Sequence, residues 1–273
     1  MHNPLPLTDR SALQRHRARA LHNSALFLHE AALEDVQDRI GMVNKIFTNP
    51  AIVTAFPDVW RKLWPDAVFV DDSDVLALKE GAHDLVVHCL GLHWANDPVG
   101  QLIQCRRALQ PDGLSLTLCF GGQTLHELRS VLGQAEIDVT GGLSPRVAPM
   151  GEIRDLGALL QRAGLALPVA DSVQLKASYG SALNLMHDLR AMGETNAMTA
   201  RLRKPTRRAV LLRAAELYMK TYGDNDGRIP ATFEIITLTG WAPDASQPQP
   251  LRPGSAAARL ADALGTHEKP LKD

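Results

Sequence analysis

Residues 84–122 read DLVVHCLGLHWANDPVGQLIQCRRALQPDGLSLTLCFGG, and this stretch decides the fold that the sequence predicts. Residues 85–90 are nearly all apolar, as a strand in a sheet covered on both faces requires. An amphipathic helix follows, with Pro98 in its first turn. Residues 111–113, Pro-Asp-Gly, are expected to end that helix in a turn, and residues 114–120 alternate as a second strand. The stretch therefore predicts one parallel strand–helix–strand crossover.

Strands and helices alternate along the rest of the chain as well. The sequence predicts helices at 9–22, 24–47, 123–136, 155–163, 181–191 and 206–221, and extended segments at 51–56, 67–70, 165–173 and 231–238. This order is typical of an α/β fold with a doubly wound, mostly parallel sheet. We divide the chain into N-terminal helices (1–47), an α/β domain (48–241) with a helical insertion at about 181–221, and a tail rich in Pro, Ser and Ala (242–273).

Composition argues against several kinds of partner. The net charge of −1 gives no reason to expect binding to nucleic acid or to an anionic membrane. No apolar run approaches the roughly 18 residues of a membrane span, so we predict no integral membrane segment. Cys89, Cys105 and Cys119 lack C-x-x-C spacing, which indicates buried thiols in a reducing compartment. We expect the bacterial cytoplasm, with the mitochondrial matrix as the alternative.

The N-terminal segment is rich in arginine. Asp9 is the only acidic residue before Glu30, in a stretch that contains Arg10, Arg15, Arg17 and Arg19. This composition resembles an organelle presequence. The alternative is a helix of the mature protein that faces solvent. We favour that alternative because the helical pattern continues to residue 47 without a zone of small residues for processing.

Glycine is absent where a nucleotide-binding domain would use it, since the chain has none from Met42 to Glu80. Such a domain normally needs glycine in its first strand-to-helix turn, where the backbone approaches the ligand closely. The corresponding residues 51–60 read AIVTAFPDVW, and Phe56 and Pro57 would fill that space. Pro57 also removes an amide donor. The sequence therefore predicts a nucleotide-type fold whose nucleotide site is damaged.

Residues that follow the predicted strands are the first candidates for a site, because α/β folds bind ligands at the carboxyl ends of strands. Asp72 could accept hydrogen bonds from a ribose or an adenine, or it could only cap a turn. His93 could act as a general base near neutral pH, or it could be a hydrogen-bonded structural histidine. Trp94 could stack on an adenine or exclude water, or it could pack in the core.

Two further patterns, the spaced histidines and a cluster of positive residues, can each be interpreted with or without a function. His83, His88 and His93 recur every five residues, but they lie before, within and after one strand, so we predict no metal site. The densest positive patch is either a solvated helix face or a docking surface for an acidic partner, and it consists of Arg201, Arg203, Lys204, Arg207 and Arg208.

Seven longer motifs carry a resemblance to known proteins: LHWANDP at 92–98, RALQPDG at 107–113, FGGQTLHELR at 120–129, GGLSPRVAP at 141–149, DLGALLQRAG at 155–164, DLRAMGETN at 188–196 and DGRIPATF at 226–233. Together they resemble class I S-adenosylmethionine-dependent methyltransferases, and more narrowly the assembly-factor branch of respiratory complex I. That branch is also similar to the malonyl-carrier-protein methyltransferase of biotin synthesis. The resemblance covers about residues 9–265 and is specific from residue 84 onward.

The resemblance implies a Rossmann-like methyltransferase fold with about one strand–helix unit missing. We therefore expect fewer than the family's seven strands, with residues 231–238 antiparallel to the rest. It also implies S-adenosylmethionine as cofactor, bound by Asp72, Leu90 and Gly91, and a reaction site with His93 and Trp94 as catalytic residues. The family's ribose carboxylate has no counterpart here, so binding of this cofactor is expected to be weak or lost.

The resemblance also implies a role. Members of the branch are described as acting on complex I during its assembly, with arginine hydroxylation of an iron–sulfur subunit attributed to them. The chain could modify a subunit of the NADH:quinone oxidoreductase using S-adenosylmethionine, or it could be a non-catalytic assembly or binding protein. A third alternative is a methyltransferase for a small molecule or a carrier protein. Segments 141–149, 181–196 and 226–233 are expected to surround one face that contacts the subunit.

Overall fold

The computed structural model describes residues 6–21, 25–248 and 260–267 of the chain. The chain divides into two compact units, Met1–Pro243 and Asp244–Asp273. The second unit contains the short helix α9 (Leu260–Ala263). The sheet and the helices α1–α8 belong to the first unit. The predicted boundaries after residues 47 and 241 stay predictions.

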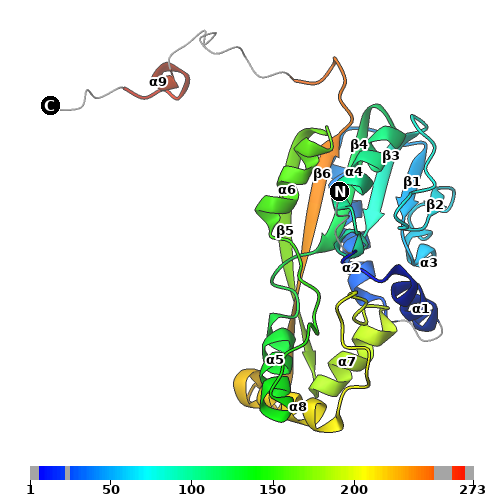
Figure 1. The fold of residues 1–273 in the computed structure, drawn as a ribbon. Coiled ribbons are helices and arrows are strands. Elements are labelled where there is room, and N and C mark those ends of the chain that lie inside the picture. The colour runs from blue at the N-terminus through cyan, green and yellow to red at the C-terminus, as the bar shows by residue number, and fades with distance from the viewer. Residues whose placement is uncertain (1–5, 22–24, 249–259, 268–273) are drawn as a thin grey trace, which may run out of the picture. The chain divides into compact units, whose positions relative to one another are not determined.

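One six-stranded sheet forms the centre of the described part of the chain, in the order β2-β1-β3-β4-β6-β5 (Figure 1). β1, β2, β3 and β4 run parallel to one another, and β6 runs antiparallel to both β4 and β5. The strands are β1 (Pro50–Val53), β2 (Val68–Val70), β3 (His83–Cys89), β4 (Leu109–Phe120), β5 (Ala166–Tyr179) and β6 (Ile229–Trp241). The predicted α/β class, the reduced strand number and the antiparallel last strand are confirmed.

Helices cover both faces of this sheet. They are α1 (Arg10–Ala20), α2 (Phe27–Met42), α3 (Pro57–Trp60), η1 (Leu92–Trp94), α4 (Pro98–Ala108), α5 (His126–Thr140), α6 (Ile153–Arg162), α7 (Ala182–Ala191) and α8 (Arg208–Tyr222). Along β3, Leu85 and Val87 join the core that contains α2, whereas Val86 packs with Cys105 and Ala108 of α4. Because successive residues of a strand face opposite sides, this double coverage accounts for the unbroken apolar run in β3.

Local sequence signals set the starts of two helices. The Asp9 side chain accepts a hydrogen bond from the Ala12 amide at the start of α1, at 3.0 Å. At the start of α4, Asp97 accepts from the Gly100 amide at 2.8 Å, and Pro98 occupies the first turn. Both are side-chain caps for amide groups that a helix leaves without partners.

The predicted turn at residues 111–113 is wrong. These residues lie inside β4, where His83 of β3 pairs with Leu109 and Leu85 pairs with Leu114. The extra residues of β4 therefore form a bulge, with Asp112 at φ 57°. A Cβ on Gly113 would lie 2.9 Å from the Gln110 carbonyl oxygen, so the bulge requires glycine there.

The antiparallel strands β5 and β6 are longer than predicted and extend beyond the parallel strands (Figure 1). The extended segment predicted at 165–173 continues to Tyr179, which pairs with Ile229. The inserted helices α7 and α8 lie between these strands in sequence, and Tyr218 of α8 donates a hydrogen bond to the Pro230 carbonyl at 2.8 Å. None of the helices in the described ranges has the length and apolarity that a membrane crossing needs.

Candidate functional site

The carboxyl ends of β1, β2 and β3 lie at the same edge of the sheet. β2 lies on one side of β1 and β3 lies on the other, so the strand order reverses between β1 and β3. Open α/β sheets bind ligands outside the strand ends at such a switch point. We call the residues found there the strand-end cluster; they are Arg10, Arg17, Phe56, Asp72 and Gly91.

Asp72 is the centre of an ion-pair network with helix α1. Arg17 Nη1 lies 2.5 Å from Asp72 Oδ1, and Arg10 Nη2 lies 3.3 Å from the same oxygen. The Asp72 side chain is only 5% exposed. Burial by itself raises the pKa of Asp72, but the Arg17 and Arg10 guanidinium groups outweigh it and lower the pKa to about 2. Asp72 is therefore ionised at neutral pH and already paired within the protein.

Phe56 lies directly after β1, in the turn where a nucleotide-binding domain would have glycine and where the sequence predicts that Phe56 fills the space beside the ligand. It is buried, and its ring centroid lies 5.0 Å from that of His29 in α2. Gly193 packs against both Phe56 and Arg17, because a Cβ on it would lie 3.2 Å from Phe56 Cζ and 3.0 Å from Arg17 Cγ. Residues from α1, from the end of β1 and from the end of α7 thus meet at this strand end.

The chain bends sharply after β3. Leu90 is buried with φ 45°, a conformation uncommon for a residue with a side chain. A Cβ on Gly91 would lie 2.5 Å from Asp72 Oδ2 and 3.1 Å from His88 Cε1. The close approach that glycine permits here is to the protein's own carboxylate. The cofactor-binding roles predicted for Leu90, Gly91 and Asp72 stay predictions.

Several buried polar atoms beside the strand-end cluster have no hydrogen-bond partner among the described residues. They are Arg10 Nη1, Arg17 Nε, His29 Nδ1, Asp72 Oδ2, His88 Nδ1 and His93 Nδ1. Burial lowers the pKa of His29 to about 4 and lowers that of His88 as well, so both rings are neutral at pH 7. Each unsatisfied buried polar group costs roughly 1–3 kcal/mol. The Arg17–Asp72 ion pair therefore holds together a region that is otherwise costly to bury.

His93 and Trp94, the predicted catalytic residues, meet at a third side chain. His93 Nε2 lies 3.2 Å from Glu194 Oε2, and Trp94 Nε1 donates to the same oxygen at 2.8 Å. Burial by itself raises the pKa of Glu194, but His93, Arg17 and Trp94 together outweigh burial and hold the pKa below its usual value. Two residues of η1 thus hold an ionised, buried carboxylate.

The end of helix α7 places Glu194. The Gly193 amide donates to the Arg190 carbonyl at 3.1 Å, and the Glu194 amide donates to the Leu189 carbonyl at 2.9 Å. This pair of bonds is a Schellman motif, and Gly193 adopts the positive φ of 77° that the motif requires. The reversal of the chain at Gly193 turns the Glu194 side chain toward η1.

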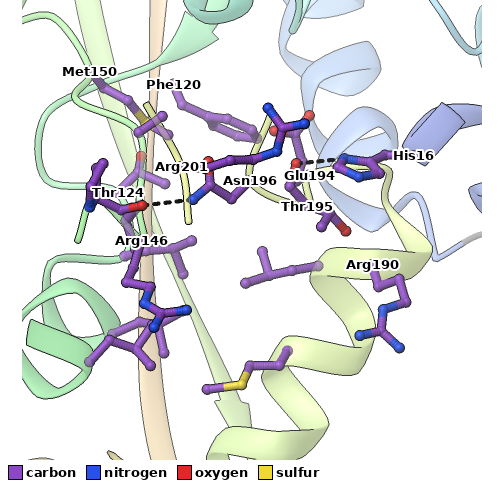
Figure 2. Close-up of a pocket in the computed structure, with 18 of the residues that line it drawn as sticks. His16, Phe120, Thr124, Arg146, Met150, Arg190, Glu194, Thr195, Asn196 and Arg201 are labelled. Carbon is purple, nitrogen blue, oxygen red and sulfur yellow. Dashed lines mark hydrogen bonds between the residues drawn. The ribbon is translucent and has the colours of Figure 1, made fainter. Parts of the chain in front are cut away.

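A cavity of about 390 Å³ lies beside Glu194 (Figure 2). Its walls are mostly apolar and include Leu28, Phe120, Leu125, Leu128, Met186, Leu189 and Phe233. Two arginines in the wall are already paired: Arg146 Nη2 lies 2.7 Å from Glu136 Oε1, and Arg201 Nη2 lies 2.8 Å from Asp9 Oδ2. Glu194 is the one acidic residue in the lining that the structure describes.

Residues from three motifs that were expected to surround one face do line this cavity. Segment 141–149 contributes Pro145, Arg146, Val147 and Ala148; segment 181–196 contributes Met186, Leu189, Arg190, Glu194, Thr195 and Asn196; segment 226–233 contributes Phe233. The Asn196 amide donates to the Pro145 carbonyl at 2.9 Å and joins the first two segments (Figure 2). That this face contacts a protein subunit stays a prediction.

Two residues central to the site were not predicted. Arg17 belongs to a helix expected to face solvent, yet it is only 8% exposed because α1 turns Arg10 and Arg17 toward Asp72. Glu194 lies within the motif at 188–196, but nothing in its spacing links it to His93. The excess of arginine without nearby acidic residues was the available signal for Arg17.

The three histidines at five-residue spacing go to separate partners. His83 Nδ1 lies 3.1 Å from the Asn49 carbonyl, His88 Nε2 lies 2.8 Å from Gln101 Oε1, and His93 contacts Glu194. Across the ranges that the structure describes, no three metal-binding side chains come together.

Comparison with known proteins gives a consistent set of relatives. The mouse (Mus musculus) protein named arginine-hydroxylase NDUFAF5, mitochondrial, is 38% identical over 233 residues, which cover 83% of this chain and 67% of that protein. The malonyl-[acyl-carrier protein] O-methyltransferase of Laribacter hongkongensis is 34% identical over 179 residues, which cover 66% of this chain and 58% of the enzyme. No protein-family model matches the chain.

The matches do not extend over whole relatives. For the zebrafish (Danio rerio) NDUFAF5 protein, 39% identical over 198 residues, the chain spans 61% of the relative's length. The solved structure of the Bacillus subtilis YcgJ protein aligns with 78% of this chain and 99% of its own, at a TM-score of 0.47 and 11% identity. The sequence relatives, at 34–39% identity, confirm the resemblance predicted from the motifs.

Proposed function

The chain belongs to the NDUFAF5 family, and from that premise we propose that it is an assembly protein of the respiratory NADH:quinone oxidoreductase. It binds a protein subunit of that enzyme at the cavity beside Glu194 and does so without using S-adenosylmethionine. We propose the bacterial cytoplasm as its location, with the mitochondrial matrix, which fits the names of the relatives, as the alternative.

One observation carries the proposal that the cofactor is not used: Asp72 is paired with Arg17 and buried at the switch point of the sheet. Asp72 is the carboxylate that the resemblance assigns to the adenine end of the cofactor. A nucleoside would have to displace Arg17 from Asp72, and it would meet Phe56 where the family has glycine. The residues present therefore do not fit S-adenosylmethionine, and we propose that binding is lost.

The cavity supports the proposal of a protein partner. It is lined by residues of three motifs of the family resemblance, of which two, 141–149 and 181–196, lie outside the central sheet. Loops on a rigid scaffold commonly carry binding function. Since relatives are named arginine hydroxylases, an arginine of the subunit is the side chain that we propose to enter the cavity.

Calorimetric titration with S-adenosylmethionine tests the first part. Without the glycine turn and the ribose carboxylate, S-adenosylmethionine loses at least two hydrogen bonds to the protein, each worth roughly 1–3 kcal/mol. This loss weakens its affinity by about two to four decades. We expect no saturable binding in the low micromolar range. A micromolar isotherm that Asp72→Ala abolishes would instead support a modifying enzyme.

A pull-down from the native host tests the second part. The wild-type protein should recover a subunit of the NADH:quinone oxidoreductase, and a deletion strain should accumulate incompletely assembled oxidoreductase. Failure to recover any such subunit, together with normal assembly in the deletion strain, would refute the proposed function.

A further inference from the structure

We infer that Glu194 recognises the guanidinium group of the partner's arginine, and that His93 and Trp94 are positioning residues for its carboxylate. This inference rests on the proposed function, because it specifies how the cavity takes hold of the subunit. It replaces the catalytic roles predicted for His93 and Trp94 with a role in holding Glu194.

The Glu194 carboxylate has one oxygen engaged and one available. Oε2 receives both recorded contacts, from His93 Nε2 and Trp94 Nε1. Oε1 accepts no hydrogen bond from the described residues. The side chain is 10% exposed, and Glu194 is part of the cavity wall. A buried, ionised carboxylate with an open oxygen is strongly favourable only when a cationic donor reaches it.

Two arginines in the wall are paired with carboxylates other than Glu194. Arg146 is neutralised by Glu136, and Arg201 is neutralised by Asp9. Burial lowers the pKa of His16, so that ring is neutral at pH 7. Arg190 is exposed at the end of α7 rather than buried beside Glu194. Glu194 is the acidic side chain that a ligand meets in the described part of the cavity lining, and its open oxygen is an acceptor for a donor group of that ligand.

The shape and lining of the cavity favour arginine among cationic side chains. Leu125, Leu128 and Leu189 offer an apolar path for a long aliphatic stem. Phe120 and Trp94 also line the cavity, and both rings lie within 5.5 Å of the His93 ring that contacts Glu194. A planar guanidinium can stack on such a ring while it donates to Oε1, whereas an ammonium group, a compact point charge, has no plane to stack.

His93 and Trp94 act through Glu194 rather than on the ligand. Both contacts end on Oε2, so they restrain the rotation of the carboxylate and leave Oε1 without a partner among the described residues. The Trp94 indole N–H thereby becomes a reporter of the site. A ligand that draws on Oε1 will change the strength of the Trp94 bond to Oε2 and shift the indole N–H resonance.

The experiment uses the full-length ¹⁵N-labelled protein and three small probes: Nα-acetyl-arginine amide, Nα-acetyl-citrulline amide and Nα-acetyl-lysine amide. Citrulline has the shape of arginine without its charge. The chain has four tryptophans, and Trp94→Phe identifies the Trp94 indole signal. We expect the arginine probe to shift that signal in a saturable titration, at least about tenfold tighter than the citrulline probe and tighter than the lysine probe.

Variants separate recognition from folding. Glu194→Gln keeps the shape and should reduce arginine affinity to the citrulline level, whereas Glu216→Gln, at an exposed position of α8, should leave it unchanged. Met186→Trp places a larger side chain in the cavity wall, leaves Glu194 itself unchanged and should also abolish binding. This variant tests the site if Glu194→Gln fails to fold. Thermal unfolding verifies each variant.

Three results would overturn the inference: no shift of the Trp94 signal by arginine, equal affinity for arginine and citrulline, or wild-type arginine affinity in a folded Glu194→Gln variant. Equal binding of lysine would overturn the preference for a guanidinium. The pull-down with Glu194→Gln distinguishes the two proposals. Undiminished recovery of the subunit would refute the role of Glu194 while leaving the proposed function intact. No recovery by the wild type, together with normal assembly in the deletion strain, would refute the proposed function itself.

Discussion

Arg17→Met should destabilise the protein through Asp72. The substitution keeps an apolar stem of similar length but leaves the Asp72 carboxylate, 5% exposed, without its nearest cation. Removing one partner of a buried ion pair costs about 3–5 kcal/mol. A fall of the Asp72 pKa from 3.8 to about 2 corresponds to about 2 kcal/mol at 1.36 kcal/mol per unit. We therefore expect a loss of about 2–4 kcal/mol in the free energy of unfolding at pH 7.

The pH dependence follows from the direction of the shift. The folded-state pKa of Asp72 is lower than its unfolded value, so its stabilising contribution is complete above the unfolded pKa of 3.8 and is lost as pH falls toward 2. Asp72→Asn should remove that part of the acid dependence. Urea unfolding, followed by tryptophan fluorescence between pH 3 and 7, measures both effects.

A double-mutant cycle provides the decisive comparison. Arg17→Met combined with Asp72→Asn should cost at least about 2 kcal/mol less than the sum of the single variants, because the second change removes the unpaired charge. The matched control is Arg39–Asp171, a pair with side chains 24% and 39% exposed, where coupling of about 1 kcal/mol or less is expected. Additive single effects at Arg17 and Asp72 would refute the argument that this pair holds the strand-end cluster together.

Three further predictions concern other positions. Gly91→Ala should lower the free energy of unfolding by about 1–3 kcal/mol, because the new Cβ would lie 2.5 Å from Asp72 Oδ2. Gly142→Ala should leave that free energy nearly unchanged, because the atom nearest to its new Cβ would be 3.8 Å away. Equal urea midpoints for the two variants would contradict this prediction. Arg146→Ala removes the bidentate contact with Glu136, so limited proteolysis should cut segment 141–149 faster in this variant than in the wild type. An unchanged cleavage rate would show that this contact does not hold the segment in place. Association with the oxidoreductase subunit should slow as salt increases, as a stopped-flow assay can measure. Changing four residues of the positive patch to Ala should remove most of that salt dependence; these residues are Arg203, Lys204, Arg207 and Arg208.

The parts of the fold that local periodicity determines were predictable from the sequence. The crossover of β3, α4 and β4 follows from one apolar run, a proline-capped amphipathic helix and an alternating strand. The bulge at residues 111–113 was not predictable, because Pro-Asp-Gly reads as a turn unless the pairing of its neighbours with β3 is known. Propensity alone carries no information on which strand lies alongside.

The candidate site, like the fold, was predictable from the sequence only in part. Phe56 and the missing glycines could be interpreted from the sequence, because they occupy a known place in a known kind of fold. The roles of Arg17 and Glu194 could not be predicted, because each contacts residues that are far away in the chain and at no fixed spacing. Arg17 contacts Asp72, and Glu194 contacts His93 and Trp94. An arginine on an N-terminal helix is usually solvated, and only the tertiary packing of α1 reveals that this one is not.

The position of β6 in the sheet has a consequence for synthesis of the protein. Among the described residues β6 is the last strand in sequence, yet it lies between β4 and β5 and is the only strand partner of β5 in the described sheet. While the chain is being made, the 14 residues of β5 emerge with no strand to pair with until residues 229–241 follow. An unpaired strand edge is a template for association with other chains. A chain that stops before residue 229 should therefore aggregate on the ribosome or soon after release, whereas one that stops after Pro243 should complete its sheet.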